Sequence, residues 1–312
     1  MIEVIKYTAD KKTDWDTFVS QSKNGTFLFY RDYMEYHSDR FDDFSLMIYF
    51  KNKLLALLPA NIVGDTIYSH QGLTFGGFIV DNEMKASLML DIFDKIKNLL
   101  SEKGKTKLIY KCVPHIYHNY TSEEDLYALF RNNAKLIRRD ISTTILLSNK
   151  IDFSNLRKRK IKQALKSDLQ IEEQNDFDNI FPLLQENLKE KHNSKPVHTQ
   201  EELNYLKSKF QDNIHFYICK SKDGNPIAGT VVYESKNVAH LQYICSNEEG
   251  RNVGAIDFLF NFLINTKYSN KAFFDFGIST ENNGLILNEG LIAQKEMFGG
   301  RGICYDTYEL DI

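Results

Sequence analysis

The stretch that decides the fold is His240-Leu-Gln-Tyr-Ile-Cys-Ser-Asn-Glu-Glu-Gly-Arg-Asn-Val-Gly254-Ala255. It begins as an apolar strand, continues through a polar turn that contains Gly250, and then opens a helix predicted to run from Arg251 to Asn265. The first amides of a helix have no partner within the helix and lie at the positive end of its dipole. A strand that leads through a glycine turn into a helix is therefore typical of a phosphate site.

The predicted phosphate site has two interpretations. In the functional one, the amides around Arg251 and Gly254 face outward without partners, and Arg251 adds a charge that binds a pyrophosphate. In the structural one, the turn needs a glycine for its geometry and nothing more. The residues predicted to hold the anionic part of a cofactor are Ser246, Asn247, Arg251, Asn252, Val253, Gly254 and Ala255.

Strands and helices alternate on both sides of this stretch. The second half is expected to begin with a helix at 155–166, a strand at 169–173, helices at 177–192 and 200–210, and strands at 215–220, 226–234 and 238–245. The helix at 251–265, a strand at 272–276, a helix at 283–297 and a strand at 303–310 follow. This order predicts a mixed α/β fold with a largely antiparallel sheet flanked by helices. The first half has a looser version of the same order, which includes one strand at 53–63.

The length of the chain indicates two domains. The 312 residues exceed an ordinary domain of about 100–200 residues. The change in pattern near Asn149 predicts an N-terminal domain at 1–149 and a C-terminal domain at 150–312.

Composition excludes several classes of protein. With 39 Lys and Arg against 42 Asp and Glu, the net charge of −3 gives no general attraction to DNA or to an anionic membrane. The start has no signal-peptide pattern, and no stretch approaches the roughly 20 apolar residues of a spanning helix. The four cysteines are scattered in strand-like contexts without metal-ligand spacing, which predicts buried free thiols, a cytoplasmic location and no metal.

The decisive stretch resembles the GNAT superfamily of acyl-CoA N-acyltransferases. Their pattern is Gln/Arg-x-x-Gly-x-Gly/Ala between a strand and the following helix, and Arg251-x-x-Gly254 matches its first half. Ile256 stands where Gly or Ala is expected, and Ala255 lies one place earlier. The resemblance implies acetyl-CoA or another acyl-CoA as co-substrate.

The rest of the second half resembles the Fem-type branch more specifically. The resemblance rests on the basic helix Leu156-Arg-Lys-Arg-Lys-Ile-Lys-Gln-Ala-Leu-Lys166, on Phe273-Phe-Asp-Phe-Gly-Ile-Ser279, and on Leu287-Asn-Glu-Gly-Leu-Ile-Ala-Gln-Lys-Glu-Met-Phe-Gly-Gly300. Fem-type proteins have two GNAT-like domains and transfer amino acids from aminoacyl-tRNA to peptidoglycan precursors. Those that use tRNA often carry a coiled-coil hairpin. This sequence has no long heptad pattern for such a hairpin, which favours a small acyl donor such as acetyl-CoA.

N-acyl transfer requires a neutral amine, a donor for the oxyanion and a proton for the leaving group. The candidate catalytic residues are Asp275 and Glu281 as bases, His240 as a further base and Tyr305 as an acid. Each has a structural alternative: a backbone hydrogen bond for Asp275, a solvated loop for Glu281, a buried hydrogen-bonded imidazole for His240 and chance for Tyr305. Asp275 is expected to point into a cleft because it ends a strand beside Gly277.

The candidate acceptor-binding residues are Tyr30, Arg31, His70, Gly76, Gly77 and Ser279. His70, Gly76 and Gly77 belong to the glycine-rich stretch Ser69-His-Gln-Gly-Leu-Thr-Phe-Gly-Gly77. This stretch either lines a cleft between the domains, which Tyr30 and Arg31 could also reach, or is a bent strand pair that needs glycine for close approach. The basic run 157–162 either binds RNA or forms a solvated helix face.

Three functional hypotheses follow. In the first, the chain is an N-acyltransferase that moves an acyl group from acetyl-CoA to an amine, such as an amino sugar or a small-molecule or lipid-linked cell-envelope precursor. In the second, the donor is aminoacyl-tRNA. In the third, a GNAT-like fold binds a glycan or peptide without turnover.

Overall fold

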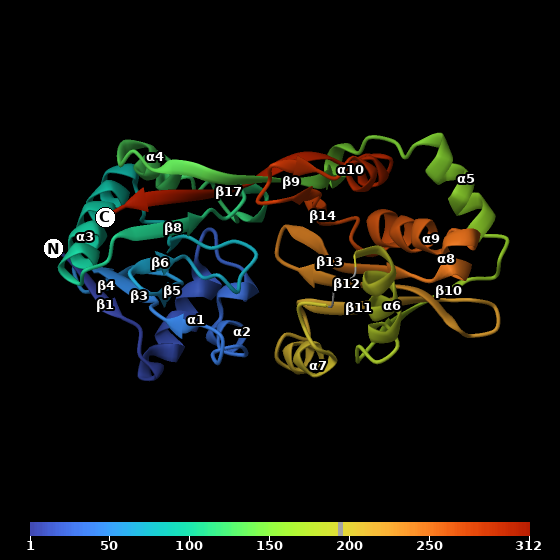
Figure 1. Ribbon diagram of the computed structural model, residues 1–312, viewed down its shortest axis with the longest axis horizontal. Helices are drawn as coiled ribbons and strands as arrows, with labels where there is room; N and C mark the ends of the chain where they lie inside the picture. The colour runs from blue at the N-terminus through green and yellow to red at the C-terminus, as the bar shows by residue number, and fades with distance from the viewer. Residues whose placement is uncertain (193–195) are drawn as a thin grey trace. The chain divides into compact units, whose positions relative to one another are not determined.

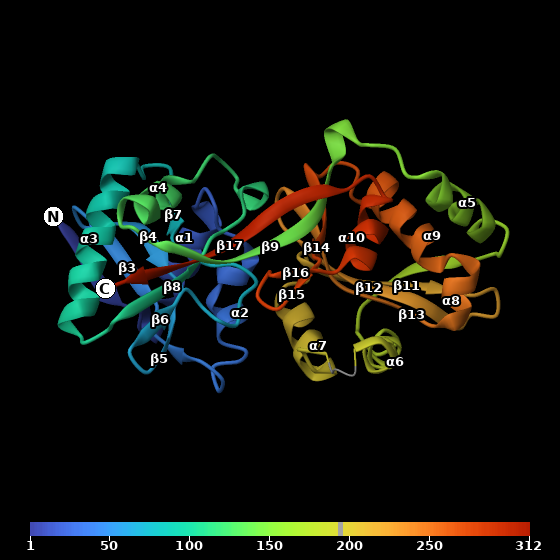
Figure 2. The same ribbon diagram turned by 45° about the horizontal axis from the view of Figure 1, so that its top comes forward.

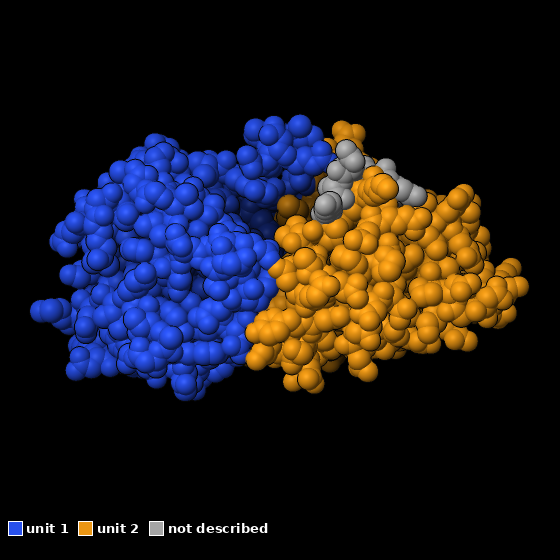
Figure 3. Space-filling view, turned by 60° about the horizontal axis from the view of Figure 1, so that its bottom comes forward, with its two compact units in different colours: residues 1–141, 280–286, 304–312 blue, residues 142–279, 287–303 orange. Residues whose placement is uncertain are grey.

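The computed structural model describes residues 1–192 and 196–312, which divide into two compact units (Figure 3). Unit 1 comprises residues 1–141, 280–286 and 304–312, and unit 2 comprises residues 142–279 and 287–303. The predicted boundary at 149/150 thus falls inside unit 2, and two later segments belong to unit 1. The chain changes unit within β9 (Lys135–Leu146), a strand without Gly or Pro, so composition gives no signal there.

Unit 1 contains most of the first half of the chain (Figure 1). Its strands and β-bridges are β1 (Ile2–Lys6), β2 (Asp42–Asp43), β3 (Leu46–Phe50), β4 (Lys53–Leu58), β5 (Asn61–Val63), β6 (Thr66–Tyr68), β7 (Ile79–Val80) and β8 (Lys107–Lys111). Its helices are α1 (Lys12–Gln21), α2 (Arg31–Met34), α3 (Ala86–Glu102) and α4 (Glu124–Arg131), with 3-10 turns η1 (Ala9–Lys11), η2 (Phe27–Phe29) and η3 (His115–Tyr117).

Unit 1 has two sheets rather than one. The order β1-β3-β4-β7 is antiparallel throughout, whereas β8, β6, β5 and β2 follow one another in the second sheet, in which β17 (Arg301–Asp311) pairs antiparallel with β8. The predicted single strand at 53–63 is therefore wrong. Pro59 separates β4 from β5 because it has no amide to donate to a ladder. The buried face of α3, which includes Met89, Ile92 and Ile96, packs into the core.

Unit 2 contains one mixed sheet with helices. Its strands are β10 (Gln170–Gln174), β11 (Ile214–Lys220), β12 (Pro226–Glu234), β13 (Val238–Ser246) and β14 (Phe273–Ile278), in that order, followed by β9. Its helices are α5 (Asn155–Ala164), α6 (Phe181–His192), α7 (Gln200–Lys209), α8 (Glu248–Val253), α9 (Ala255–Phe262) and α10 (Glu289–Glu296), with η4 (Leu147–Asn149) and the π-helix η5 (Leu263–Lys267).

Helices cover both faces of the unit 2 sheet. Leu241 and Ile244 of β13 pack with Leu259 and Phe260 of α9, and Figures 1 and 2 show α6 and α7 on the opposite face. Cys245 faces that opposite side, because its sulfur contacts the carbonyl of Ile180, just before α6, at 3.9 Å. The mixed α/β class predicted from the order of elements is confirmed.

The two parallel strands at the centre of unit 2 separate after a short pairing. β13 and β14 pair only at Val238–His240 with Phe273–Asp275, whereas β13 continues beside β12 to Ser246. The β12–β13 register shifts between the partners of Val231 and Val232, which marks a β-bulge at Gln242. The C-terminal halves of β13 and β14 therefore have a gap between them, and helices fill only part of it.

Two predicted helices are shorter than expected. The helix at 251–265 is interrupted, because Gly254 adopts a left-handed conformation with φ 78° between α8 and α9. The helix at 283–297 begins only at Glu289, after the short strands β15 (Thr280–Glu281) and β16 (Ile286–Leu287). Asn282 and Asn283 have positive φ values of 47° and 54°, which form a turn between those strands.

Cys112, Cys219 and Cys245 are buried free thiols, whereas Cys304 is exposed on β17, contrary to the prediction for all four. Within residues 1–192 and 196–312, no helix is long and apolar enough to cross a membrane, and no group of His, Cys, Asp and Glu side chains could hold a metal ion.

Candidate functional site

A pocket of about 360 Å³ lies in unit 2, where β13 and β14 diverge. The residues that line it are Ile244, Cys245 and Ser246 of β13, Phe276 of β14, Gly250 and Arg251 of α8, Ile256, Asp257 and Phe260 of α9, Leu291, Gln294 and Lys295 of α10, Phe298, Arg157 and Lys160 of α5, and Asn187 and Leu188 of α6. Its wall is mainly apolar, and its charged groups are mostly cationic.

The aromatic rings of the apolar wall are closely packed. The rings of Phe260, Phe276 and Phe298 lie within 5.3–5.9 Å of one another, and each is at most 2% exposed. Such close aromatic packing adds to the area that each ring buries.

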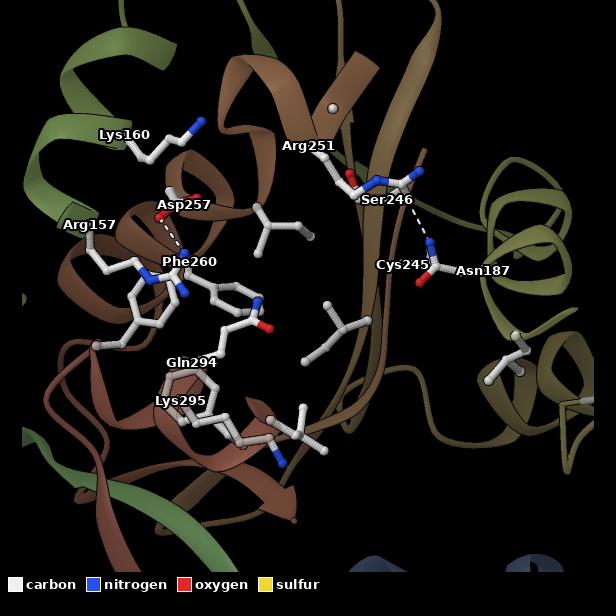
Figure 4. A pocket seen from close by; sticks show the side chains of 17 residues that line it. Arg157, Lys160, Asn187, Cys245, Ser246, Arg251, Asp257, Phe260, Gln294 and Lys295 are labelled. Atoms are coloured by element: carbon white, nitrogen blue, oxygen red, sulfur yellow. Dashed lines mark hydrogen bonds and ion pairs between the residues drawn. The ribbon is translucent and has the colours of Figure 1, made fainter. Parts of the chain in front are cut away.

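Cationic groups gather near one end of the pocket, and a lysine lies near the other. Figure 4 shows Lys160 and Arg251 at the first end and Lys295 at the second. The Arg251 guanidinium donates to the carbonyl of Ser246 at 2.8 Å, and Asn187 donates to the same carbonyl. Lys160 forms no ion pair with any residue that the structure describes. The end formed by Lys160 and Arg251 therefore attracts anions.

Arg157 is held in the wall by an ion pair. Its Nη1 donates to Oδ1 of Asp257 at 3.0 Å, and its guanidinium lies over the ring of Phe298 at 4.7 Å. Burial raises the pKa of the Asp257 carboxyl, although Arg157 acts in the opposite direction. The Nε atom of Arg157 is buried without a partner among the described residues, so the guanidinium retains one donor.

His240 and Asp275 form a hydrogen-bonded pair across the last residues at which β13 and β14 pair. Nδ1 of His240 lies 2.8 Å from Oδ2 of Asp275. Oδ1 of Asp275 accepts from the hydroxyls of Ser142 at 2.5 Å and Thr144 at 3.0 Å, both on β9, and from the amide of Gly277 at 3.2 Å. Asp275 is fully buried and so does not point into the open pocket, contrary to the prediction.

The geometry around Asp275 assigns the tautomer of His240. A carboxylate accepts, so Nδ1 of His240 carries the hydrogen and Nε2 retains its lone pair. Nε2 has no hydrogen-bond partner in the described part of the chain, and the residue keeps 9% of its surface exposed. Asp275 thus fixes the orientation of the His240 ring.

Lys295 links this pair to the pocket. Its ammonium donates to the carbonyls of Gly277 and Ile278, each at 2.8 Å, where β14 ends. The ring of His240 lies against the same glycine, because a Cβ built on Gly277 falls 3.4 Å from Cε1 of His240. Burial lowers the pKa of Lys295 to about 8, although the Asp275 carboxylate acts against it.

The predicted phosphate cradle is only partly present. The amide of Arg251 donates to the carbonyl of Asn247 at 3.1 Å, and that of Gly254 donates to Gly250, so the expectation of outward, unpaired amides is wrong. The physical reason is that the helix starts earlier, at Glu248, with Asn247 as its cap. Of the seven predicted cofactor-binding residues, Ser246 and Arg251 line the pocket.

The other five predicted cofactor-binding residues have structural contacts. Asn247 caps α8 through its side chain, which accepts from the amide of Gly250 at 2.9 Å. The carbonyl of Asn252 accepts from Gln163 at 2.9 Å, and Val253 ends α8. Gly254 lies against the backbone of Lys160, and Ala255 is fully buried.

The predicted acceptor-binding residues of unit 1 are mostly buried. Arg31 is 2% exposed, donates to Glu35, Asp43 and Ser45, and lies over the ring of Tyr7. Tyr30 is half-buried and precedes α2. Burial lowers the pKa of His70, which stacks on His37, to about 3.

Gly76 and Gly77 allow close backbone approach. A Cβ on Gly76 would lie 2.0 Å from the carbonyl oxygen of Ser69, and one on Gly77 would lie 2.6 Å from the hydroxyl of Tyr110. That hydroxyl accepts from the amide of Phe78 and donates to Asp125, whose pKa burial raises to about 6. These close contacts favour the interpretation of the glycine-rich stretch as a bent segment that needs glycine for close approach.

The remaining predicted residues lie apart from the pocket wall. Glu281 is exposed on β15, and Tyr305 of β17 shares a hydrogen bond of 3.0 Å with the hydroxyl of Tyr117 in unit 1. Ser279 is fully buried, and its carbonyl accepts from the amide of Asn288 at 2.9 Å.

Sequence reasoning missed Lys295, Arg157, Lys160 and Asn187 as parts of one site. Lys295, Arg157 and Lys160 lie in the segments that carry the Fem-type resemblance, which is the signal that could have found them. Their convergence depends on how α5, α6 and α10 pack around β13, which local spacing does not reveal.

Comparison with known proteins supports the fold. No family model matches the sequence, and no curated protein matches it. The crystal structure of FemX superposes with a TM-score of 0.69 at 11% identity, covering 99% of this chain and 97% of that one. L-PGS from Bacillus licheniformis gives 0.64 at 12% identity, covering 96% of this chain and 91% of that one.

A tandem GNAT protein from the clavulanic acid biosynthesis pathway gives a TM-score of 0.53 at 9% identity, covering 100% of this chain and 98% of that one. At these identities the likeness concerns the fold. The chain has the fold of two tandem GNAT-like units of the Fem type, as the sequence resemblance implied.

Proposed function

We propose that the protein is an N-acyltransferase whose donor binds in unit 2 between β13 and β14. The observation that carries this proposal is the pocket at the divergence of those strands, which has cations at one end and Lys295 at the other. Lys295 donates to the carbonyl of Gly277, and the ring of His240 in the His240–Asp275 pair lies against that glycine, outside the pocket wall. A donor fits this arrangement if the anionic part of its carrier lies at the cationic end and the uncharged chain that bears the acyl group lies along the apolar wall. The GNAT-like fold supports the same class of reaction.

His240 is proposed as the general base. Its Nε2 accepts a proton from the acceptor amine as the amine nitrogen bonds to the acyl carbon, and Asp275 stabilises the imidazolium through Nδ1. The bond from the acyl carbon to the leaving sulfur or oxygen then breaks. The imidazolium returns its proton to the leaving group, so that protons balance over the cycle.

Lys295 is proposed to stabilise the oxyanion. Its ammonium is buried beside the end of β14, where a fixed charge acts more strongly than in water. The acceptor is proposed to be an amine of a small or lipid-linked cell-envelope precursor.

An acyl-CoA is the first candidate donor. Acetyl-CoA is tested by thiol release with amino sugars as acceptors and by thermal shift. A ligand at about 100 times its Kd stabilises the folded state by about 2.7 kcal/mol. Ile244→Trp, which fills the pocket, abolishes the shift, whereas the control Ile137→Trp, on the exposed part of β9 in unit 1, retains it. A shift that survives Ile244→Trp removes the donor from this pocket.

Aminoacyl-tRNA is a second candidate donor, favoured by the basic helix α5. Arg157 and Lys160 of α5 line the pocket, and Lys158, Arg159 and Lys162 are exposed beside them. RNA binding through these charges weakens steeply with salt, because counterions are released from the phosphates. Salt-independent binding of aminoacyl-tRNA would contradict this second function.

A further inference from the structure

We propose that the acyl group is delivered by an acidic carrier protein, which docks on the outer face of α5 and inserts a thioester arm with a single phosphate into the pocket. This inference rests on the proposed function and names the partner of the same site. It follows from three features: the acidic first turn of α8, the composition of the outer face of α5, and the continuity of that face with the pocket.

The first turn of α8 is unsuited to a pyrophosphate. Glu248 and Glu249 are its first two residues, both exposed, and they directly precede Gly250 and Arg251 in the pocket wall. Their carboxylates already complement the positive end of the helix dipole. A donor with several phosphates at this rim meets two like charges, whereas a single phosphate between Lys160 and Arg251 meets cations.

The outer face of α5 mixes cations with exposed apolar side chains. Arg159 and Lys162 of α5, and Lys166 two residues after its end, are exposed and form no ion pair with any described residue. Leu156 in the first turn is 41% exposed, and Leu165, which caps the C-terminal end of the helix, is 62% exposed. The opposite side of the helix is fixed in unit 2, where Ile161 and Ala164 are buried.

This composition favours a protein partner over RNA. Leucines beside cations provide the apolar contact that a protein interface buries at its centre, and the cations select an acidic partner. The patch also spans one helix of ten residues, about 15 Å at 1.5 Å per residue. That length suits contact with a helix of a small partner, whereas nucleic acid is usually held along a longer basic track.

The outer face of α5 is continuous with the pocket. Arg157 and Lys160 line the pocket from the same helix that exposes Arg159 and Lys162. Figure 2 shows α5 on the outside of unit 2, next to α8 and α9. A partner on α5 therefore holds the phosphate of its arm close to Lys160, and the apolar wall receives the rest of the arm.

The test compares three acetyl donors: acetyl-pantetheine, acetyl-CoA and an acidic bacterial acyl carrier protein loaded with an acetyl group. We expect kcat/KM to be at least about tenfold higher with the carrier protein than with acetyl-CoA. The triple variant Arg159→Glu, Lys162→Glu, Lys166→Glu should lose this advantage and keep transfer from acetyl-pantetheine within about twofold, because the pocket is unchanged. The control triple variant changes Lys209, Lys222 and Lys236, which are exposed elsewhere in unit 2, to Glu.

A binding measurement keeps the inference separate from turnover. The carrier protein with its arm should bind the wild type more tightly than the carrier without it, and Ile244→Trp should remove the difference. If no donor is turned over but the α5 variant alone loses the carrier, the docking surface stands and the proposed function falls. Equal carrier binding by the α5 variant and the wild type, a preference for acetyl-CoA, or binding of RNA in place of the carrier would each overturn the inference.

Discussion

Nδ1 of His240 lies 2.8 Å from Oδ2 of Asp275, and these two residues are the last pair in the register of β13 and β14. The strands diverge directly after these residues, and the pocket lies between the diverging ends. The pair thus lies where the two parallel strands separate. The Nε2 atom of His240 has no hydrogen-bond partner among the described residues.

Replacing His240 with Gln should lower kcat by about 10²- to 10⁴-fold, because the acceptor amine then loses its general base. Donor binding should change little, since His240 is not in the pocket wall. The matched control is His215→Gln on β11, away from the pocket. The imidazole of His215 is likewise held by a carboxylate, because its Nδ1 lies 2.6 Å from Oε1 of Glu173. Steady-state rates and melting temperatures of both variants check this, and a His240→Gln enzyme with normal kcat would refute the assignment.

Lys295 should give the rate a descending limb near pH 8. Burial lowers its pKa to about 8, so the cation that stabilises the oxyanion is present below that pH and lost above it. Lys295→Arg should move the limb to higher pH, and Lys295→Met should lower kcat at every pH. The pH profile of kcat checks this. A limb that stays in place in Lys295→Arg would belong to another group.

The lowered pKa of Lys295 should also make the free energy of unfolding depend on pH. Between about pH 8 and the ordinary value of 10.5, the unfolded chain holds a proton at Lys295 that the folded chain releases. The free energy of unfolding therefore rises with pH through this window. Lys111, whose pKa burial also lowers to about 8, adds a rise of the same sign. Urea denaturation of Lys295→Met and Lys111→Met at both ends of the window separates the two contributions.

Breaking the Arg157–Asp257 pair should be costly. The side chains are 13% and 8% exposed, so Asp257→Ala leaves a largely buried guanidinium without its carboxylate, at a cost of about 3–5 kcal/mol. The exposed pair Lys158–Asp152 is the control, because Asp152→Ala should cost about 0–1 kcal/mol. Urea denaturation measures both. Equal losses would show that Asp257 contributes no more than a surface charge.

Gly76→Ala should destabilise unit 1 without changing donor affinity. The added Cβ lies 2.0 Å from the carbonyl oxygen of Ser69, so the backbone must shift, whereas the pocket belongs entirely to unit 2. Gly104→Ala is the control: its φ is +66° but its Cβ meets open space, which limits the cost to about 1–2 kcal/mol. Normal stability of Gly76→Ala together with weaker acceptor binding would instead support the substrate-binding interpretation.

Much of unit 2 could be predicted because local signals agree there. The turns Asp223-Gly224-Asn225 and Ser235-Lys236-Asn237 set the hairpins of β11, β12 and β13. Four of the six predicted ends of these strands match the structure, and the other two differ by one residue. The left-handed break at Gly254 was missed because apolar spacing continues across it into α9. A glycine inside a periodic pattern does not by itself reveal its φ.

The site was only partly predictable for a different reason. The sequence analysis named His240 and Asp275 separately, but their hydrogen bond depends on the parallel pairing of two strands that are separated along the chain by α8 and α9. Lys295 reaches Gly277 because α10 packs beside the end of β14. These are tertiary relationships, and no local periodicity encodes them.

The central claim is that the gap between β13 and β14 holds the acyl donor. The most direct test is a crystal structure with a ketone analogue of acetyl-phosphopantetheine, in which a methylene group replaces the thioester sulfur. We expect the phosphate to lie beside Lys160 and Arg251 and the ketone oxygen to face Lys295. An analogue bound outside the unit 2 pocket, with Ile244 and Phe276 uncontacted, would contradict it.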